Sequence, residues 1–284
     1  MTIRTVGVVG AGAMGSGIAN LAALSEFNVI LVDVEQKVLD NGLTRIDKFM
    51  EKSVKKEKLT PEQKAQTLER IQATTDMSEL KAADLVVEAV IEDLDVKKKV
   101  FQNLDEIVPE GVMLTTNTSS MSITEIASAT NRPELVAGMH FFNPAQLMKL
   151  VEVVKGYHTK DETVEELKTF SESLGKVPVV VQKDTPGFIV NRIMVPQFIE
   201  AIKLLEEGVA TPEDIDKAVT LGLNYPMGPF TLQDYAGVDI GYYVMDYMAE
   251  EFNDTRFAPP MLLKQMLRAG TVGKKSGAGF YNYE

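Results

Sequence analysis

The sequence contains no cysteine among its 284 residues and only 2 histidines. Without cysteine the chain can form no disulfide, offers no thiolate nucleophile and holds no metal through sulfur, which is compatible with a reducing compartment. Because histidine is so scarce, any proton transfer by an imidazole depends on one of two positions, His140 or His158.

Positive charge is also in short supply, since 29 Lys and Arg residues face 41 Asp and Glu residues and leave a net charge of −12. Such an acidic chain is poorly suited to binding nucleic acid or anionic membrane surfaces. Its longest apolar runs fall far short of the about 20 residues of a membrane-spanning helix. A strand pattern begins within a few residues of the start, without a basic and apolar leader. We therefore expect a soluble, cytoplasmic protein with no nucleic-acid or membrane partner.

Up to about residue 185, short runs rich in Val, Ile and Leu alternate with helical patterns. This alternation predicts an α/β fold of the Rossmann type, with a largely parallel sheet covered on both faces. We expect strands at 3–9, 29–33, 84–89, 112–117, 135–142, 149–154 and 176–181, and helices at 13–24, 94–107, 123–129 and 163–174. Residues 35–72 show no strand pattern and predict a helical insertion, two helices broken at Thr60-Pro61.

The pattern changes after the segment Asp184-Thr-Pro-Gly187. From there onwards the sequence shows only helical periodicity, interrupted by proline-containing breaks, and no strand. We therefore expect two domains, a Rossmann-type domain at 1–185 and an all-helical C-terminal domain at 186–284.

A glycine run, Gly10-Ala-Gly-Ala-Met-Gly15, joins the first predicted strand to the first predicted helix. Gly10 permits the tight turn, Gly12 lets the backbone approach a pyrophosphate, and Gly15 lets the helix pack closely on the sheet. Asp33 ends the second strand, where its carboxylate would hold the ribose hydroxyls of NAD and repel the 2′-phosphate of NADP. The glycine run alone is a weak signal, but this order of strand, glycines, helix and acid predicts an NAD-binding domain.

His140 lies near the end of a predicted strand, and Glu152 lies within the next one. If the connection at 143–148 turns the chain back, the carboxylate can reach the imidazole, fix its tautomer and stabilise its charged form. Such a pair is suited to moving a proton while a nicotinamide carries out the redox step. A histidine at the end of a strand is also commonly a core residue, and that interpretation stays open. His158 lies in a polar segment typical of a solvated loop.

Several motifs occur in order along the whole chain and make it resemble the L-3-hydroxyacyl-CoA dehydrogenase family. They are Gly10-Ala-Gly-Ala-Met-Gly-Ser-Gly17, Asn117-Thr-Ser-Ser120, His140-Phe-Phe-Asn-Pro144, Lys149-Leu-Val-Glu-Val153, Thr185-Pro-Gly-Phe-Ile-Val-Asn-Arg192 and Gly273-Lys-Lys-Ser-Gly-Ala-Gly-Phe-Tyr281. The length, with no fused hydratase domain, is most similar to that of the stand-alone bacterial members. The resemblance implies reversible oxidation of a short-chain 3-hydroxyacyl-CoA thioester, (S)-3-hydroxybutyryl-CoA, to acetoacetyl-CoA with NAD.

The resemblance also implies roles for individual residues. His140 would be the catalytic acid–base residue and Glu152 its orienting partner, with Ser119 and Asn191 beside the reacting region of the substrate. The implied cofactor contacts are Gly10, Gly12, Ala13, Met14, Gly15, Asp33, Glu92, Lys97, Ser119, Asn143 and Lys275. The implied substrate contacts are Ser119, Asn143, Asn191 and Lys56.

Some of these assignments have a plain structural alternative. The segment 117–120 could simply cap the next helix. Lys97 begins a run of three lysines, which is typical of a solvated face. Lys56 lies in the lysine-rich stretch 52–58, which suits the 3′-phosphate of coenzyme A, although Phe49 stands where the family usually has a serine.

The C-terminal domain is expected to form a homodimer, as in the family. Its apolar positions Tyr242, Tyr243, Met245 and Met248 could form that interface or the domain's own core. Two other functions stay open. Dehydrogenases of free 3-hydroxy acids also join a Rossmann domain to a helical one, but generally use a lysine in place of the His–Glu pair. Lens crystallins recruited from the family bind dinucleotide as structural proteins, and a turnover assay with NADH and acetoacetyl-CoA separates all three.

Overall fold

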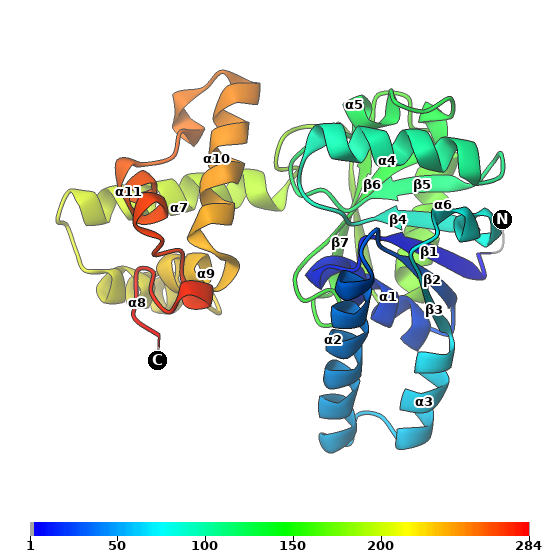
Figure 1. Cartoon of the computed structure of the whole chain (residues 1–284). Coiled ribbons are helices and arrows are strands. Elements are labelled where there is room, and N and C mark those ends of the chain that lie inside the picture. The colour runs from blue at the N-terminus through cyan, green and yellow to red at the C-terminus, as the bar shows by residue number, and fades with distance from the viewer. Residues whose placement is uncertain (1–2, 284) are drawn as a thin grey trace. The chain divides into compact units, whose positions relative to one another are not determined.

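The computed structural model describes residues 3–283 of the chain. It divides into two compact units, Met1–Asp184 and Thr185–Glu284 (Figure 1). Two hydrophobic clusters lie in the first unit and one in the second. None of the helices within 3–283 has the length and apolarity needed to pass through a membrane.

The first unit is built on an 8-stranded sheet with the order β3-β2-β1-β4-β5-β6-β7-β8. Its strands are β1 (Thr5–Val9), β2 (Asn28–Val32), β3 (Ile71–Thr74), β4 (Leu85–Glu88), β5 (Met113–Thr116), β6 (Val136–Phe141), β7 (Leu150–Lys155) and β8 (Val177–Val181). All neighbouring pairs are parallel except β6 and β7, which run antiparallel. Because β1 to β6 all run in the same direction, their carboxyl ends meet at one edge of the sheet, where open α/β folds bind ligands.

Helices cover both faces of this sheet. They are α1 (Ala13–Leu24), α2 (Gln36–Lys55), α3 (Pro61–Glu69), α4 (Leu94–Ile107), α5 (Ile123–Ala127) and α6 (Asp161–Ser173). In β4, Leu85 and Val87 enter the core shared with α1, α2 and α6, whereas Val86 enters the core shared with α4 and α5. Figure 1 shows α4 and α5 on one side of the sheet and α1 and α2 on the other. The expected parallel sheet with two covered faces is confirmed.

The inserted segment forms the helical hairpin that the sequence predicts, with one omission. Thr60 caps α3 through a capping box with Gln63, and Pro61 occupies the first helical position, which explains the break between α2 and α3. The prediction missed β3, Ile71–Thr74, which pairs only with β2 at the edge of the sheet. Polar and apolar residues alternate along β3, so it lacks the apolar run of an interior strand.

The second unit is built from helices, as the sequence predicts, with only isolated bridges near the C-terminal end of its described residues. The helices are α7 (Val190–Glu206), α8 (Pro212–Gly222), α9 (Pro229–Ala236), α10 (Val238–Phe252) and α11 (Met261–Ala269). Met245 and Met248 are buried in the core of this unit, so the expectation that they form a dimer surface is wrong. Tyr242 packs partly against the same core, and Tyr243 is exposed.

Two buried aspartates fasten the C-terminal residues to this core. Asp216 Oδ2 accepts a hydrogen bond from the hydroxyl of Tyr281 at 2.9 Å, and Asp234 Oδ2 accepts one from the hydroxyl of Tyr283 at 3.0 Å. Burial and the carboxylate acceptors raise the pKa of both tyrosine hydroxyls above the usual range. Glycine is required at position 279, because a Cβ on Gly279 would lie 2.0 Å from the carboxylate of Asp234.

Candidate active site

The turn between β1 and α1 is tightly packed at two of its glycines and open at the third. Gly10 has a φ of +99°, and a Cβ there would lie 2.5 Å from the carbonyl oxygen of Ala89. A Cβ on Gly15 would lie 1.7 Å from the carbonyl oxygen of Gly10. A Cβ on Gly12, by contrast, would meet nothing within 4 Å. The backbone at Gly12 is therefore open to a ligand, as a turn that holds a phosphate requires.

Helix α1 begins directly after this turn. Gly12 occupies its N-cap position, and no side chain of the described residues caps the helix there. The first turn, which includes Ala13, Met14 and Gly15, contains no acidic residue. The first amides of a helix lack partners within it and carry partial positive charge. These residues therefore fit the pyrophosphate of a dinucleotide.

Asp33 lies beside the turn, directly after β2. Its Oδ2 accepts a hydrogen bond from the amide of Ala11 at 2.8 Å, and its Oδ1 accepts one from the amide of Glu35 at 3.2 Å. The half-buried carboxylate thus lies beside the glycine turn at the edge of the sheet, and its contact with the ribose of NAD stays a prediction. No sequence motif points to Arg45 of α2, yet its Nη2 donates to the carbonyl oxygen of Ala11 at 2.7 Å.

The antiparallel strands β6 and β7 bring His140 and Glu152 together. The two residues are direct partners in the register, and His140 Nδ1 lies 2.7 Å from Glu152 Oε2. Both are buried, with exposed fractions of 6% and 0%, and the ring of Phe142 lies 4.4 Å from that of His140. An ionised carboxylate only accepts, so this hydrogen bond places a hydrogen on Nδ1 and fixes the tautomer of the ring. The chain does turn back at 143–148, and the contact that this turn allows is present.

The connection between β6 and β7 carries the exposed Asn143 and is fastened by a buried lysine. Lys176 Nζ donates to the carbonyl oxygens of Ala145 and Met148 at 2.6 and 2.8 Å. Burial lowers the pKa of the Lys176 ammonium, because the charged form loses solvation. The residues that follow His140 are therefore anchored to the start of β8.

The segment after β5, which contains Asn117 and Ser119, is held by hydrogen bonds to β6 and to Glu92. Asn117 Oδ1 accepts a hydrogen bond from the amide of Phe141, in β6, at 2.9 Å. Ser119 donates to Glu92 Oε1 from its amide at 2.9 Å and from its hydroxyl at 3.2 Å. The side chain that caps α5 is that of Ser122, so capping is not the role of the preceding motif. Ser119 thus follows β5 at the sheet edge where His140 lies at the end of β6.

Lys97 is buried, and the interpretation of its lysine run as a solvated face is wrong at this position. Its side chain is 1% exposed, and its Nζ lies 2.8 Å from Glu88 Oε1 and 3.3 Å from Glu92 Oε2. Desolvation acts to raise the pKa of Glu92, but the charge of Lys97 and the hydrogen bonds from Thr118 and Ser119 outweigh it, and this pKa is lowered. No motif identifies Glu88. The sequence feature that could have pointed to it is a carboxylate at the end of an otherwise apolar strand.

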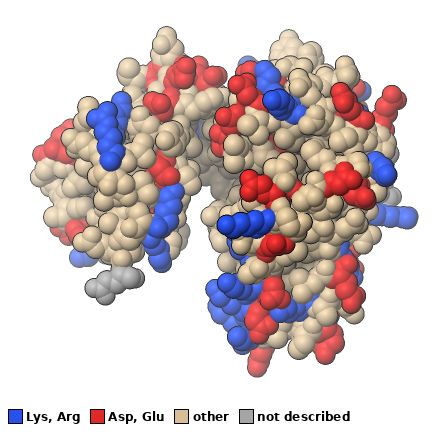
Figure 2. Space-filling model, in the orientation of Figure 1, with Lys and Arg blue, Asp and Glu red and all other residues tan. Residues whose placement is uncertain are grey.

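Three further site residues expected from the sequence are carried by other elements. Asn191 lies in the first turn of α7, and Lys275 lies in the turn Lys274–Ser276, where its Nζ donates to Asp239 Oδ2 at 2.6 Å. Lys56 is exposed directly after α2, in a part of the first unit where Figure 2 shows basic and acidic side chains mixed. Their roles toward cofactor and substrate stay predictions.

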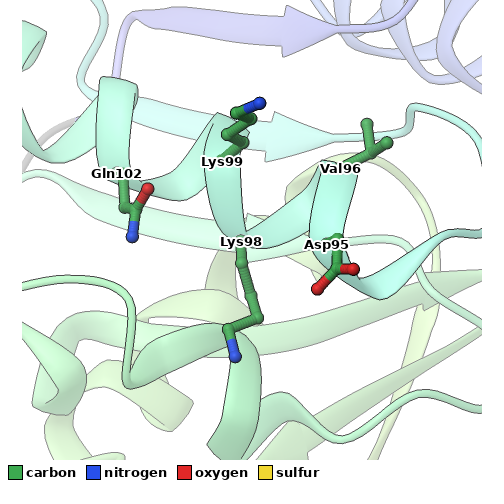
Figure 3. A pocket seen from close by; sticks show the side chains of 5 residues that line it. All are labelled: Asp95, Val96, Lys98, Lys99 and Gln102. Atoms are coloured by element: carbon green, nitrogen blue, oxygen red, sulfur yellow. The ribbon is translucent and has the colours of Figure 1, made fainter.

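The surface hollow on α4 does not mark this site. The hollow drawn in Figure 3 has a volume of about 300 Å³ and is lined by Asp95, Val96, Lys98, Lys99 and Gln102 of α4. Lys98 and Lys99 point to different sides of the helix and not toward a common centre. None of the site residues expected from the sequence lines this hollow.

Comparisons with known proteins agree along nearly the whole chain. Residues 5–185 match the family model described as 3-hydroxyacyl-CoA dehydrogenase, NAD binding domain, and residues 187–283 match the C-terminal domain of that family. The 3-hydroxybutyryl-CoA dehydrogenase of Clostridioides difficile is 45% identical over 97% of this chain and 98% of its own length. The probable 3-hydroxybutyryl-CoA dehydrogenase of Bacillus subtilis (strain 168) is 43% identical over 100% of this chain and 99% of its own. The crystal structure of (S)-3-hydroxybutyryl-CoA dehydrogenase from Ralstonia eutropha has 44% identity and a TM-score of 0.95, covering 100% of both chains.

Proposed function

The chain belongs to the 3-hydroxyacyl-CoA dehydrogenase family of NAD-dependent oxidoreductases, and on this premise we propose that it interconverts (S)-3-hydroxybutyryl-CoA and acetoacetyl-CoA. The observation that carries the proposal is the 2.7 Å hydrogen bond between His140 and Glu152, in a unit that also has an open phosphate turn at Gly12. Oxidation of an alcohol to a ketone requires a proton acceptor beside a dinucleotide, and this unit offers groups suited to both.

His140 is the proton carrier in this proposal. Its Nε2 takes up the proton of the 3-hydroxyl group in oxidation and returns a proton to the 3-oxo oxygen in reduction. Bound NAD supplies the redox chemistry, as acceptor or donor of the hydride at C3. Glu152 keeps the Nδ1 hydrogen in place and stabilises the imidazolium that forms when Nε2 takes up its proton. Because both side chains are buried, this stabilisation is stronger than it would be in water.

The substrate contacts belong to the same proposal. Ser119 is suited to the reacting end of the thioester because Glu92 orients both its amide and its hydroxyl. Asn143 and Asn191 are each assigned as substrate contacts from the family motifs alone. Lys56 is assigned to the coenzyme A moiety, and its support is the exposed lysine-rich end of α2 on an otherwise acidic chain.

We extend the proposal to a homodimer formed through residues 186–284. Large apolar side chains of the second unit remain exposed, among them Leu221 at 80%, Leu223 at 62% and Tyr243 at 61%. Exposed apolar side chains of this size are suited to a contact with a partner where they lie close together. Sedimentation or light scattering should therefore give a mass of twice 31.3 kDa. A mass equal to that of one chain would exclude the dimer.

The function is tested by NADH oxidation with acetoacetyl-CoA and, separately, with free acetoacetate. We expect turnover with the thioester and little with the free acid. An equal kcat/KM for free acetoacetate would favour a dehydrogenase of free 3-hydroxy acids. NADH binding without turnover of either compound would favour a non-catalytic dinucleotide-binding protein. The His140–Glu152 pair supports turnover of the thioester, because neither a dehydrogenase of free 3-hydroxy acids nor a non-catalytic protein requires this pair.

A further inference from the structure

Strand β4 ends in a carboxylate that is fully buried in the first unit. Glu88 has an exposed fraction of 0%. Its Oε1 accepts hydrogen bonds from the amide of Val90 at 2.7 Å and from Lys97 Nζ at 2.8 Å. Its Oε2 accepts one from the hydroxyl of Thr116 at 2.6 Å. These contacts hold the carboxylate in one position between β4, β5 and α4.

Lys97 connects this carboxylate to a second one. Its Nζ lies 3.3 Å from Glu92 Oε2 as well as 2.8 Å from Glu88 Oε1. The side chain of Glu92 is 39% exposed, whereas that of Lys97 is 1% exposed. The ammonium group therefore ties Glu92 to the buried carboxylate of Glu88.

Glu92 in turn orients the segment that follows β5. Its Oε1 accepts hydrogen bonds from the amide of Ser119 at 2.9 Å, from the hydroxyl of Ser119 at 3.2 Å and from the hydroxyl of Thr118 at 2.5 Å. The contacts thus run without a gap from Glu88 through Lys97 and Glu92 to Ser119.

The stability of the sheet does not require the contacts among Glu88, Lys97 and Glu92. Apolar side chains of similar size are often as stabilising as a buried ion pair, because desolvation of the charges offsets their attraction. Two carboxylates share one ammonium group here, which leaves an excess of negative charge. What such a network of satisfied charges does provide is a single geometry for every group in it.

We propose that Glu88 is a positioning residue for the reaction, which acts through Lys97 and Glu92 to fix Ser119. The inference rests on the proposed function, because Ser119 is assigned there to the reacting end of the substrate. Glu88 itself touches neither substrate nor cofactor. Its effect is on the placement of a group that does, and a small misplacement of such a group slows the chemical step.

Glu88→Gln tests the inference with little change of shape. Glutamine keeps an acceptor for the hydroxyl of Thr116 but removes the charge that holds Lys97. We expect kcat for acetoacetyl-CoA reduction to fall on the order of 10- to 100-fold. KM for acetoacetyl-CoA should change by less than about threefold, and the dissociation constant of NADH should rise much less than kcat falls, because Glu92 and Lys97 are expected cofactor contacts that the variant shifts but does not remove. A loss of NADH affinity that matches the loss of kcat would overturn the inference.

Glu125→Gln is the matched control. Glu125 pairs with Lys98, the neighbour of Lys97 on α4, at 3.1 Å, but these side chains are 49% and 32% exposed. Such exposed pairs contribute little, so this variant should keep the kcat of the wild type. Equal losses in Glu88→Gln and Glu125→Gln would also overturn the inference.

A double-mutant cycle shows whether Glu88 acts through Ser119. If it does, the variant that combines Glu88→Gln with Ser119→Ala should be no slower than Ser119→Ala alone. If the fold losses in kcat of the two single variants multiply in the double variant, Glu88 and Ser119 act independently, and the inference is then wrong.

Amide hydrogen exchange in the segment 117–121 gives a readout that does not depend on the reaction. Glu88→Gln should speed exchange there, and Glu125→Gln should not. Unchanged exchange in Glu88→Gln overturns the inference, whereas a wild type that is inactive toward acetoacetyl-CoA overturns the proposed function instead. Thr116→Val removes the hydroxyl that binds Glu88 Oε2 and serves for the same measurements if Glu88→Gln fails to fold. Because this hydroxyl also accepts from the amide of Thr118 at 3.2 Å, exchange in this variant is compared at 119–121.

Discussion

Arg45 Nη2 donates a hydrogen bond to the carbonyl oxygen of Ala11 at 2.7 Å, reaching from α2 into the turn between β1 and α1. Asp33 holds the amide of the same residue at 2.8 Å. The peptide groups on both sides of Ala11 are therefore fixed, and the turn needs little rearrangement to receive a phosphate. Binding is strengthened when the binding groups are already in place, because less entropy is lost.

Arg45→Ala should weaken NADH binding. One lost hydrogen bond contributes about 0.5–1.5 kcal/mol, which raises the dissociation constant of NADH about 2- to 10-fold. Fluorescence titration with NADH measures this change. Lys48→Ala, which alters an exposed lysine of the same helix, is the control. Equal dissociation constants for the two variants would show that the turn keeps its shape without the guanidinium group.

His140→Gln should lower kcat on the order of 10²- to 10⁴-fold, the usual contribution of a positioned acid–base group. NADH affinity should stay nearly unchanged in the same titration, because the glycine turn and Asp33 are intact. His158→Gln is the control, since that histidine is exposed and lies against the ring of Tyr157. Near-native turnover of His140→Gln would rule out the proton-transfer role.

The lowered pKa of Glu92 predicts a pH-dependent contribution to stability. Desolvation opposes the shift, but the charge of Lys97 and the hydrogen bonds from Thr118 and Ser119 lower the folded-state pKa below 4.5. A carboxylate of this kind stabilises the fold fully above its unfolded pKa, and the contribution is lost as the pH falls through the folded pKa. Urea unfolding of the wild type and Glu92→Gln should therefore differ most above about pH 5 and converge in acid. A constant difference across this range would contradict the prediction.

Tyr281→Phe should destabilise the second unit. The lost hydroxyl donates at 2.9 Å to Asp216, which is only 7% exposed, and we expect a decrease of about 1 kcal/mol or more in the free energy of unfolding. Tyr235→Phe is the matched control, because the hydroxyl of Tyr235 accepts a hydrogen bond from the exposed Lys274, at 3.2 Å, and not from a buried group. Chemical denaturation measures both variants. Equal free energies of unfolding for the two variants would mean that the remaining donors satisfy Asp216 without Tyr281.

Periodicity predicts most of this fold because its interior strands are buried on both faces. The bounds of α1 and α4 agree with the sequence-based ranges 13–24 and 94–107, since Gly12 and Asp93 mark where those helices begin. Strand β3 has no such local signal. It exists through its pairing with β2, and pairing between segments far apart in the chain cannot be read from either segment alone.

The residues of the candidate site likewise divide into those with a local sequence signal and those without one. The glycine turn and His140 belong to local motifs and can be found in the sequence. Lys97 and Lys98 look alike there, yet their side chains are 1% and 32% exposed. Glu88 and Arg45 depend on partners 28 and 34 residues away, Thr116 and Ala11, which only the folded sheet brings near.

The pairing of His140 with Glu152 across β6 and β7 limits how this sequence can change over generations. Two residues opposite each other on antiparallel strands stay opposite whatever the length of the connection between the strands. Insertions and deletions within 143–148 therefore leave the pair intact. One residue added inside either strand turns a side chain to the other face and separates the pair in a single step. The length of that loop can therefore change without separating the pair, whereas a change of length within either strand separates it.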